Sequence, residues 1–504
     1  MSRQTAVLLG SMVVFVALMF LMSSSTPKRP SGPSGKDLSG EAEPLVLFCA
    51  ASNRAVMESI QAQYETEFHR SIQIQYGASQ TLLASIEVSK AGDLFLPADD
   101  SFIEIGSQKG LLSEVLPLAT MRGVVAVQRG NPKGIRAFSD LLRAEVRVVQ
   151  ASTDASAIGK RTREALIENK HWERLVSATL AFQTTVTDVA NDLVVESADA
   201  GIIYDVLLKS YPKLESIELP ELDGIVSQVS LAVISGSKQP QAALHFARYV
   251  ASRDRGLKHY ADQGFRVANG DVWSDVPELS IFAGSMLRPA IEETLVAFEQ
   301  REGVRVSRVY NGCGILVAQM KAGQHPDAYF ACDTEFMNQV PELFPKPVDV
   351  SMNELVILVQ KGNPLEIQTL RDVARKGIRV GVGHEKQCAM GWLTQNTLRE
   401  GGVQKEVMEN VTVQSPTGDM LVNQLRTGSL DAAIVYLSNA AGSSETLDAI
   451  QIKGLSCAVA TQPFAVAEGS PNAHLAERLF QRICSAESKE VFEAEGFRWQ
   501  VPKP

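Results

Sequence analysis

Apolar residues recur along this chain in short runs that alternate with segments of helical periodicity. The apolar run 45–49 precedes segment 55–68, whose apolar residues fall on one helical face, and run 280–283 precedes a similar segment, 287–298. Alternation of this kind is typical of α/β layers in which helices cover mostly parallel sheets. The pattern therefore predicts an α/β fold.

The pattern also predicts that one module occurs twice. The motif Gln-Arg-Gly-Asn-Pro at 128–132 returns as Gln-Lys-Gly-Asn-Pro at 360–364, an offset of 360 − 128 = 232. Gly264 and Gly496, each followed by Phe-Arg, are separated by 496 − 264 = 232. A near-constant offset over most of the chain indicates duplication of a whole module rather than scattered chance matches.

The amino terminus has a different character. Thr5–Met22 is almost entirely apolar, longer than a usual signal-peptide core and just long enough to span a bilayer. We predict that residues 1–25 are a signal or membrane anchor, and we favour a retained anchor. Residues 26–44 are rich in Pro, Ser and Gly and are predicted to be a flexible linker. The two modules, residues 45–276 (module 1) and 277–504 (module 2), are then expected in the periplasm, tethered to the inner membrane.

Composition narrows the function. With 48 basic and 58 acidic residues the net charge is −10, which argues against a nucleic-acid partner. An anion site in such a chain must depend on local dipoles and hydrogen-bond donors. The seven histidines do not cluster in the sequence, and no Ser-His-Asp order, paired-carboxylate motif, phosphate loop or CxxC motif stands out. We predict that the protein is not an enzyme and needs no cofactor.

Polar residues at the ends of the predicted strands are the first candidates for a binding site. In open α/β sheets, ligands bind outside the carboxyl ends of the strands, where helices begin. Ser52, Ser79, Ser285 and Cys313 all fall at such strand-to-helix junctions. Serine is also a favoured helix N-cap, so Ser52 and Ser285 could serve that purpose without a ligand.

Several short motifs carry a resemblance to a known family. In module 1 they are Ala50-Ala51-Ser52, Ala78-Ser79-Gln80-Thr81-Leu82, Gly92-Asp93-Leu94-Phe95, Ala98-Asp99, Gly201-Ile202-Ile203-Tyr204 and Gly264-Phe265. In module 2 they are Ala283-Gly284-Ser285, Asp327, Cys332-Asp333, Ala433-Ile434-Val435-Tyr436 and Gly496-Phe497. In this order and spacing the chain resembles the type II periplasmic solute-binding proteins, and among them the molybdate/tungstate-binding proteins of ABC importers.

The resemblance implies two tandem modules, each made of two α/β lobes with a central cleft that closes on a tetrahedral dianion. Hydroxyl groups and backbone N–H groups at helix N-termini would hold the anion, since these N–H groups lack helical partners and lie at the positive end of the helix dipole. The implied ligand-binding residues are Ser52, Ser79, Ile158, Val186 and Tyr204 in module 1, and Ser285, Cys313, Met390, Gly418 and Tyr436 in module 2. The implied partner is an ABC permease in the membrane.

Module 2 departs from the family pattern at its cysteines. Cys313 takes the place of the second serine, and Cys332 and Cys388 also fall at junctions expected to line the cleft. Three thiols in one cleft could bind a soft metal such as Cu(I) or a thiophilic oxyanion. Two of them could instead form a disulfide across the cleft and lock the clamp, or all three could be small buried apolar residues.

The sequence therefore favours a binding protein that captures a small oxyanion for import. A membrane-tethered sensor or scaffold with degenerate clefts is the alternative, and soft-metal binding by module 2 is a variant of the first hypothesis. Tyr204 and Tyr436 end apolar runs and could be core residues whose hydroxyls are satisfied within the protein. Asp99 and Asp333 are expected to hold a strand end or hinge.

Overall fold

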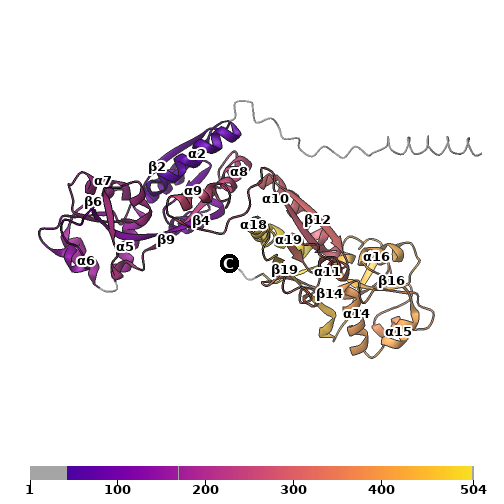
Figure 1. The fold of residues 1–504 in the computed structure, drawn as a ribbon. Helices are drawn as coiled ribbons and strands as arrows, with labels where there is room; N and C mark the ends of the chain where they lie inside the picture. Colours follow the sequence, from indigo (N-terminus) through magenta and orange to yellow (C-terminus); the bar gives the residue numbers. More distant parts are fainter. Residues whose placement is uncertain (1–42, 168–169, 502–504) are drawn as a thin grey trace, which may run out of the picture.

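The computed structural model describes residues 43–167 and 170–501 (Figure 1). The predicted membrane segment and nearly all of the predicted linker lie outside these residues. None of the helices within the described ranges combines the length and the apolar character needed to cross a membrane.

Module 1 begins with a lobe (lobe A) built on strands β1, β2, β3 and β9 and the first part of β4. The strands of this lobe are β1 (Leu45–Ala50), β2 (Ile72–Gly77), β3 (Leu94–Leu96), β4 (Leu112–Gln128), β9 (Val226–Ile234) and β10 (Arg266–Val267). Its helices are η1 (Ala51–Asn53), α2 (Arg54–Phe68), α3 (Ser79–Ser89), α4 (Ser101–Gln108), α8 (Pro240–Val250) and α9 (Gly256–Asp262). Strand β1 pairs in parallel with β2 on one side and β3 on the other, and it is buried along nearly its whole length, as expected for a central parallel strand covered on both faces.

The second lobe of module 1 (lobe B) lies between the two halves of lobe A in sequence. Its strands are the end of β4, β5 (Val148–Ala151), β6 (Thr179–Gln183), β7 (Ala200–Tyr204) and β8 (Leu214–Ile217). Its helices are η2 (Phe138–Leu142), α5 (Ala157–Ile167), α6 (His171–Ala178), α7 (Val186–Val194), η3 (Asp205–Lys209) and η4 (Pro220–Leu222). Strand β4 joins the lobes, because residues up to Arg122 pair with β9 and those from Gly123 pair with β7.

Module 2 repeats this architecture. Its strands are β11 (Glu278–Gly284), β12 (Arg305–Asn311), β13 (Ala328–Phe330), β14 (Val348–Gln360), β15 (Val380–Gly383), β16 (Val411–Ser415), β17 (Ala432–Tyr436), β18 (Leu447–Gln451), β19 (Val459–Val466) and β20 (Arg498–Trp499). Its helices are η5 (Ser285–Leu287), α10 (Arg288–Glu302), α11 (Cys313–Lys321), α12 (Thr334–Met337), α13 (Leu370–Val373), α14 (Ala389–Glu400), α15 (Gln404–Asn410), α16 (Gly418–Arg426), α17 (Leu437–Ala441), η6 (Ser456–Ala458), α18 (Ala473–Ile483) and α19 (Ala486–Ala494).

The two modules have the same strand order. It is β2-β1-β3-β9-β4-β7-β5-β6 in module 1 and β12-β11-β13-β19-β14-β17-β15-β16 in module 2. Pairs such as β1–β3 and β5–β7 are parallel, whereas β4 and β14 pair antiparallel with every neighbour, so the sheets are mixed rather than mostly parallel. This topology confirms the predicted fold class of two tandem modules, each with two α/β lobes.

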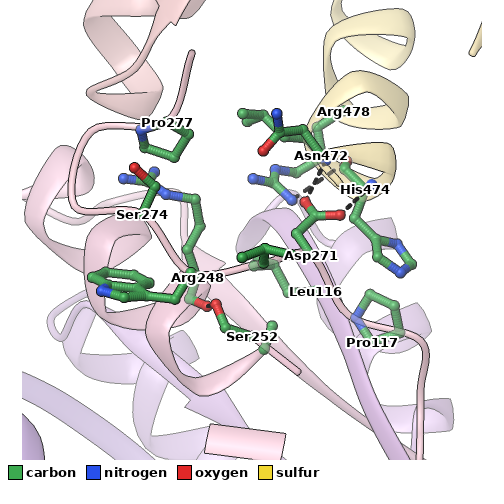
Figure 2. A pocket seen from close by; sticks show the side chains of 14 residues that line it. Leu116, Pro117, Arg248, Ser252, Asp271, Ser274, Pro277, Asn472, His474 and Arg478 are labelled. Atoms are coloured by element: carbon green, nitrogen blue, oxygen red, sulfur yellow. Dashed lines mark hydrogen bonds between the residues drawn. The ribbon is translucent and has the colours of Figure 1, made fainter. Parts of the chain in front are cut away.

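The modules meet through helices α8, α10 and α18, which lie side by side near the centre of the molecule (Figure 1). Glu302 of α10 is fully buried there, and its carboxylate accepts hydrogen bonds from Arg478 at 2.7 and 3.0 Å and from Arg248 of module 1 at 3.3 Å. Asp271 accepts hydrogen bonds from the backbone of His474 and Leu475 in the first turn of α18. Figure 2 shows Arg248, Asp271, His474 and Arg478 around the small pocket between the modules. These contacts fix the two modules against each other.

Candidate functional site

Ser52 lies where strand β1 passes into helix α2, as the sequence predicted. Its Oγ is buried and has no hydrogen-bond partner among the described residues. Ser52 lines a cavity of about 110 Å³, together with Arg54 from the same lobe and with Thr187 and Val206 from lobe B. The Ser52 hydroxyl is therefore available at a junction between the two lobes.

Ser79 is the first residue of helix α3 and is buried. The backbone N–H of Ala98 donates to its Oγ at 3.1 Å, which leaves the hydroxyl hydrogen free to donate elsewhere. One residue on, the N–H of Gln80 donates at 3.2 Å to the carbonyl of Ala155, which belongs to lobe B. The two lobes of module 1 thus touch at the N-terminus of α3.

Ile158 and Val186 are both in the first turn of lobe B helices, where backbone N–H groups lack helical partners. Gly159 follows Ile158 because a Cβ there would lie 2.3 Å from the carbonyl oxygen of Ser152. Val186 opens α7, whose N-cap, Thr185, accepts a hydrogen bond from the N–H of Asp188. Both predicted donors are therefore at helix N-termini, and α7, which Val186 opens, packs against η1, which contains Ser52.

Tyr204 ends strand β7 and is fully buried. Its hydroxyl forms a 2.9 Å hydrogen bond with Ser227 Oγ, and burial raises its pKa well above the usual value. The Tyr204 hydroxyl thus has a partner within the protein, which is the core role that the sequence left open.

An ion pair that the sequence did not predict joins the lobes of module 1. Asp99, at the end of β3 in lobe A, accepts hydrogen bonds from Nε and Nη2 of Arg161, each at 2.9 Å. Arg161 lies on α5 of lobe B, so this bidentate pair spans the cleft. Asp99 also accepts a hydrogen bond from the N–H of Ser101, consistent with the expected role at a strand end. No motif signals such a pair, because its members are 161 − 99 = 62 residues apart.

In module 2 the predicted site residues occupy the same places. Ser285 opens η5, Met390 lies in the first turn of α14, and Gly418 is the first residue of α16. Tyr436 ends strand β17. Unlike Tyr204, Tyr436 has a buried hydroxyl for which the described part of the chain provides no hydrogen-bond partner.

The greatest departure is at Cys313, which forms a disulfide with Cys332. Cys313 opens α11 and Cys332 follows β13, so both belong to the same lobe. Two of the three cysteines do form a disulfide, which is one of the alternatives that the sequence left open, but the bond lies within one lobe and does not cross the cleft. The N–H of Cys332 donates to Cys313 Sγ at 3.1 Å, as Ala98 does to Ser79 in module 1.

Cys388 remains a free, buried thiol at the N-cap of α14. Burial raises its pKa to about 11, and hydrogen bonds from the backbone of Gly391 and Met390 oppose this rise. Two of the three thiols proposed as soft-metal ligands are thus joined as a disulfide. Over the ranges that the structure describes, no group of three or more His, Cys, Asp and Glu residues is placed to hold a metal ion.

Comparison with known proteins assigns the family. The profile of the family described as "Bacterial extracellular solute-binding protein" matches residues 45–266 and again residues 279–498. The chain belongs to this family, with one match in each module.

Individual relatives with more specific descriptions have low sequence identity to this chain. The molybdate-binding protein ModA of Mycobacterium tuberculosis is 27% identical over 249 residues, which are 48% of this chain and 91% of ModA. The putative ABC transporter substrate-binding lipoprotein YvgL of Bacillus subtilis is 23% identical over 259 residues, or 50% of this chain and 96% of YvgL.

Solved structures that the chain resembles include the substrate-binding domain of a putative molybdenum ABC transporter from Clostridium difficile. The two sequences are 22% identical, the match covers 45% of this chain and 99% of that chain, and the TM-score is 0.36. The Azotobacter vinelandii periplasmic molybdate-binding protein has 14% identity, covers 45% of this chain and 100% of its own, and has a TM-score of 0.39.

Proposed function

We propose that the protein captures a small oxyanion, molybdate or tungstate, outside the cytoplasm and delivers it to an ABC permease. Module 1 would carry the oxyanion site, and capture would be closure of its two lobes on the anion, with no chemical step. The N-terminal segment would tether the modules to the inner membrane, close to the permease.

The observation that carries this proposal is the pair of serines at the first cleft. The Ser52 hydroxyl is buried at a cavity between the lobes with no partner in the described ranges, and the Ser79 hydroxyl has a hydrogen free to donate. Neutral donors of this kind suit a dianion in a protein of net charge −10, because they stabilise negative charge locally without a basic surface. The relatives that bind molybdate by their printed descriptions support the same ligand class.

The test is calorimetric titration of the purified full chain with molybdate, tungstate and sulfate. We expect saturable molybdate or tungstate binding that weakens about 10- to 100-fold in Ser52→Ala and in Ser79→Ala, as for loss of one hydrogen bond to a charged group. Ser59→Ala, at an exposed position on α2, is the matched control and leaves binding unchanged. Absence of binding to all three anions, or full affinity in both site variants, would refute the proposal.

The alternative is a membrane-tethered sensor or scaffold in which a cleft has lost its transport role. The observation that favours it is the disulfide of module 2, which replaces a serine hydroxyl by a sulfur that has no hydrogen to donate. Oxyanion binding at module 1 with no growth defect on limiting molybdate after deletion of the protein would favour this alternative over import.

A further inference from the structure

The base of the second cleft contains polar groups that the first cleft lacks. Strand registers establish the equivalent positions in the two modules. Tyr329 pairs with Phe282 where Phe95 pairs with Phe48, and Asn353 pairs with Ala460 where Met121 pairs with Ser227. Module 2 therefore has a phenol in place of a phenyl ring and an amide in place of a thioether.

Tyr436 has lost the partner of its equivalent in module 1. The Tyr204 hydroxyl bonds to Ser227, whereas the position equivalent to Ser227 is Ala460, which offers no side-chain polar group. The Tyr436 hydroxyl is consequently buried and unpartnered in the described chain. Residues directly opposite on antiparallel strands share a face, so the Asn353 side chain lies on the same face as that of Ala460, the face on which Tyr204 meets Ser227 in module 1.

Asn353 is itself buried without a partner. It is 1% exposed, and neither its Oδ1 nor its Nδ2 has a hydrogen-bond partner in the part of the chain that the structure describes. The same holds for the hydroxyl of Tyr329, whose ring is fully buried. A buried polar group without a partner costs about 1–3 kcal/mol. Several such groups in one place therefore point to a polar molecule that they bind.

Asp333 adds a carboxyl group that has no cationic partner among the described residues, although its Oδ1 accepts a hydrogen bond from the N–H of Glu335 at 2.8 Å. In module 1 its equivalent, Asp99, is paired with Arg161, but the position equivalent to Arg161, at 161 + 232 = 393, is Leu393. Asp333 is 5% exposed, and no Lys, Arg or His among the described residues is close enough to form a salt bridge with it.

These groups converge. The side-chain amide of Gln462 donates both to the carbonyl of Cys332, next to Asp333, and to that of Ala460, opposite Asn353. Burial raises the pKa of the Tyr329 and Tyr436 phenols, and the negative charge of Asp333 adds to both rises. The cluster Tyr329, Asn353, Tyr436 and Asp333 (the cleft-2 cluster) thus consists of buried residues that come from both lobes of module 2.

The two lobes of module 2 touch at the N-terminus of α11. The N–H of Gly314 donates at 3.2 Å to the carbonyl of Gln387 in the opposite lobe, and a Cβ at Gly312 would lie 2.3 Å from that oxygen. Module 1 has the equivalent contact, in which the N–H of Gln80 donates at 3.2 Å to the carbonyl of Ala155, so the lobes touch in the same way in both modules. Access to the cleft-2 cluster therefore requires the lobes to open.

We propose that the second cleft binds a small neutral or cationic molecule that carries its own O–H or N–H donors, and that it excludes fully deprotonated oxyanions. The Asp333 carboxylate and the Asn353 carbonyl oxygen accept hydrogen bonds from such a ligand, and the two phenols and the Asn353 amide group donate to its oxygens. A tetrahedral dianion has no proton to offer Asp333, is repelled by its charge, and finds no hydroxyl at the disulfide. The two modules then capture ligands of different chemistry.

Titration of the full chain with ethanolamine tests this inference, because protonated ethanolamine carries both an ammonium group and a hydroxyl. We expect saturable binding at one site per chain, weakened at least tenfold in Asp333→Asn and in Asn353→Met, which restores the module 1 residue. Asp349→Asn, at an exposed position on β14, is the matched control and binds as the wild type does. Circular dichroism tests whether each variant is folded. If Asp333→Asn or Asn353→Met fails to fold, Tyr436→Phe is titrated in its place.

Molybdate titration of the same preparations separates this inference from the proposed function. One molybdate per chain, unaffected by Asp333→Asn, supports the inference. A second molybdate that is lost in Ser285→Ala overturns it, as does failure of ethanolamine to bind or binding that Asp333→Asn leaves intact. Absence of any molybdate binding overturns the proposed function instead, and leaves the ethanolamine result to decide the inference.

Discussion

Asp99 and Arg161 form a bidentate ion pair that holds the two lobes of module 1 together. Both N–O distances are 2.9 Å, and Asp99 is fully buried while Arg161 is one-third exposed. Planar guanidinium–carboxylate pairing fixes orientation as well as distance, so this contact defines one closed arrangement of the lobes. In module 2 the same place has Asp333 and Leu393, and no such pair can form.

Replacing Arg161 by Leu, the module 2 residue, should destabilise the closed form of module 1. The change leaves the buried Asp99 carboxylate without its cation, which costs several kcal/mol in a fully buried site and about 2 kcal/mol here because Arg161 is partly exposed. We expect a lower thermal unfolding temperature and a larger radius of gyration by small-angle X-ray scattering. Arg163→Leu removes the same charge from an exposed position on the same helix. An equal effect of that variant would contradict the role of the Asp99–Arg161 pair in holding the lobes together.

Loss of the Cys313–Cys332 disulfide should destabilise module 2 selectively. The bond closes a loop with a sequence separation of 19, for which chain-entropy arguments give about 3 kcal/mol. The double variant Cys313→Ser with Cys332→Ala recreates Ser79 and Ala98 of module 1. We expect its chemical denaturation to show an earlier transition for module 2 and an unchanged transition for module 1.

The free thiols provide the control for this prediction. Cys484→Ala removes a partly buried cysteine that has no disulfide and should shift neither transition by a comparable amount. Because both bonded cysteines are buried, dithiothreitol should reduce the wild type slowly in native buffer and quickly in denaturant. Rapid reduction under native conditions would show that the bond is accessible through lobe opening.

The sequence predicted the fold well because the fold depends on patterns that repeat. Runs such as 45–49 are apolar on both faces because both faces of the central strand β1 are buried, and the constant offset near 232 reports duplication directly. The positions of Ser52 and Ser79 could also be predicted, because a polar residue at a strand-to-helix junction is a local signal, and their binding role stays a prediction.

The contacts between the lobes could not be predicted from the sequence. Arg161 pairs with Asp99 only because lobe B packs against lobe A. Asn353 becomes a candidate only when the structure shows that its buried amide has no hydrogen-bond partner among the described residues. The cysteines were noticed, but sequence could not decide which two would bond or whether they belong to one lobe. Pairing across a cleft depends on tertiary geometry, which local periodicity does not encode.

The inter-module contact at Glu302 gives a third prediction. Glu302→Gln should loosen the two modules, because it leaves the buried guanidinium groups of Arg248 and Arg478 without a counter-ion. Removing one partner of a buried ionic cluster costs about 3–5 kcal/mol. We expect faster proteolysis near residues 269–277 and a broader distance distribution between labels on the two modules. Glu293→Gln, at an exposed position on α10, should have neither effect.

The last prediction concerns pH and Asp333. Burial raises its pKa from 3.8 to about 6, with a smaller contribution from the charge of Glu335, while hydrogen bonds from the backbone of Glu335 and from Thr334 oppose the rise. The folded state therefore holds this proton more tightly than the unfolded state does. The stability contribution of this group is greatest below about pH 4, decreases as pH rises towards 6, and is constant above that. A shift of this size corresponds to about 3 kcal/mol.

Asp333→Asn should abolish that dependence while keeping the N-cap of α12, because asparagine caps helices as well as aspartate does. In ligand-free buffer we expect the variant to be more stable than the wild type above pH 7, by up to about 3 kcal/mol, and equally stable near pH 4. Asp349→Asn, which removes an exposed carboxylate from β14, should follow the wild-type profile. If instead Asp333→Asn lowers stability at pH 8, the folded protein stabilises the charged carboxylate, and the pKa of Asp333 is not raised by burial.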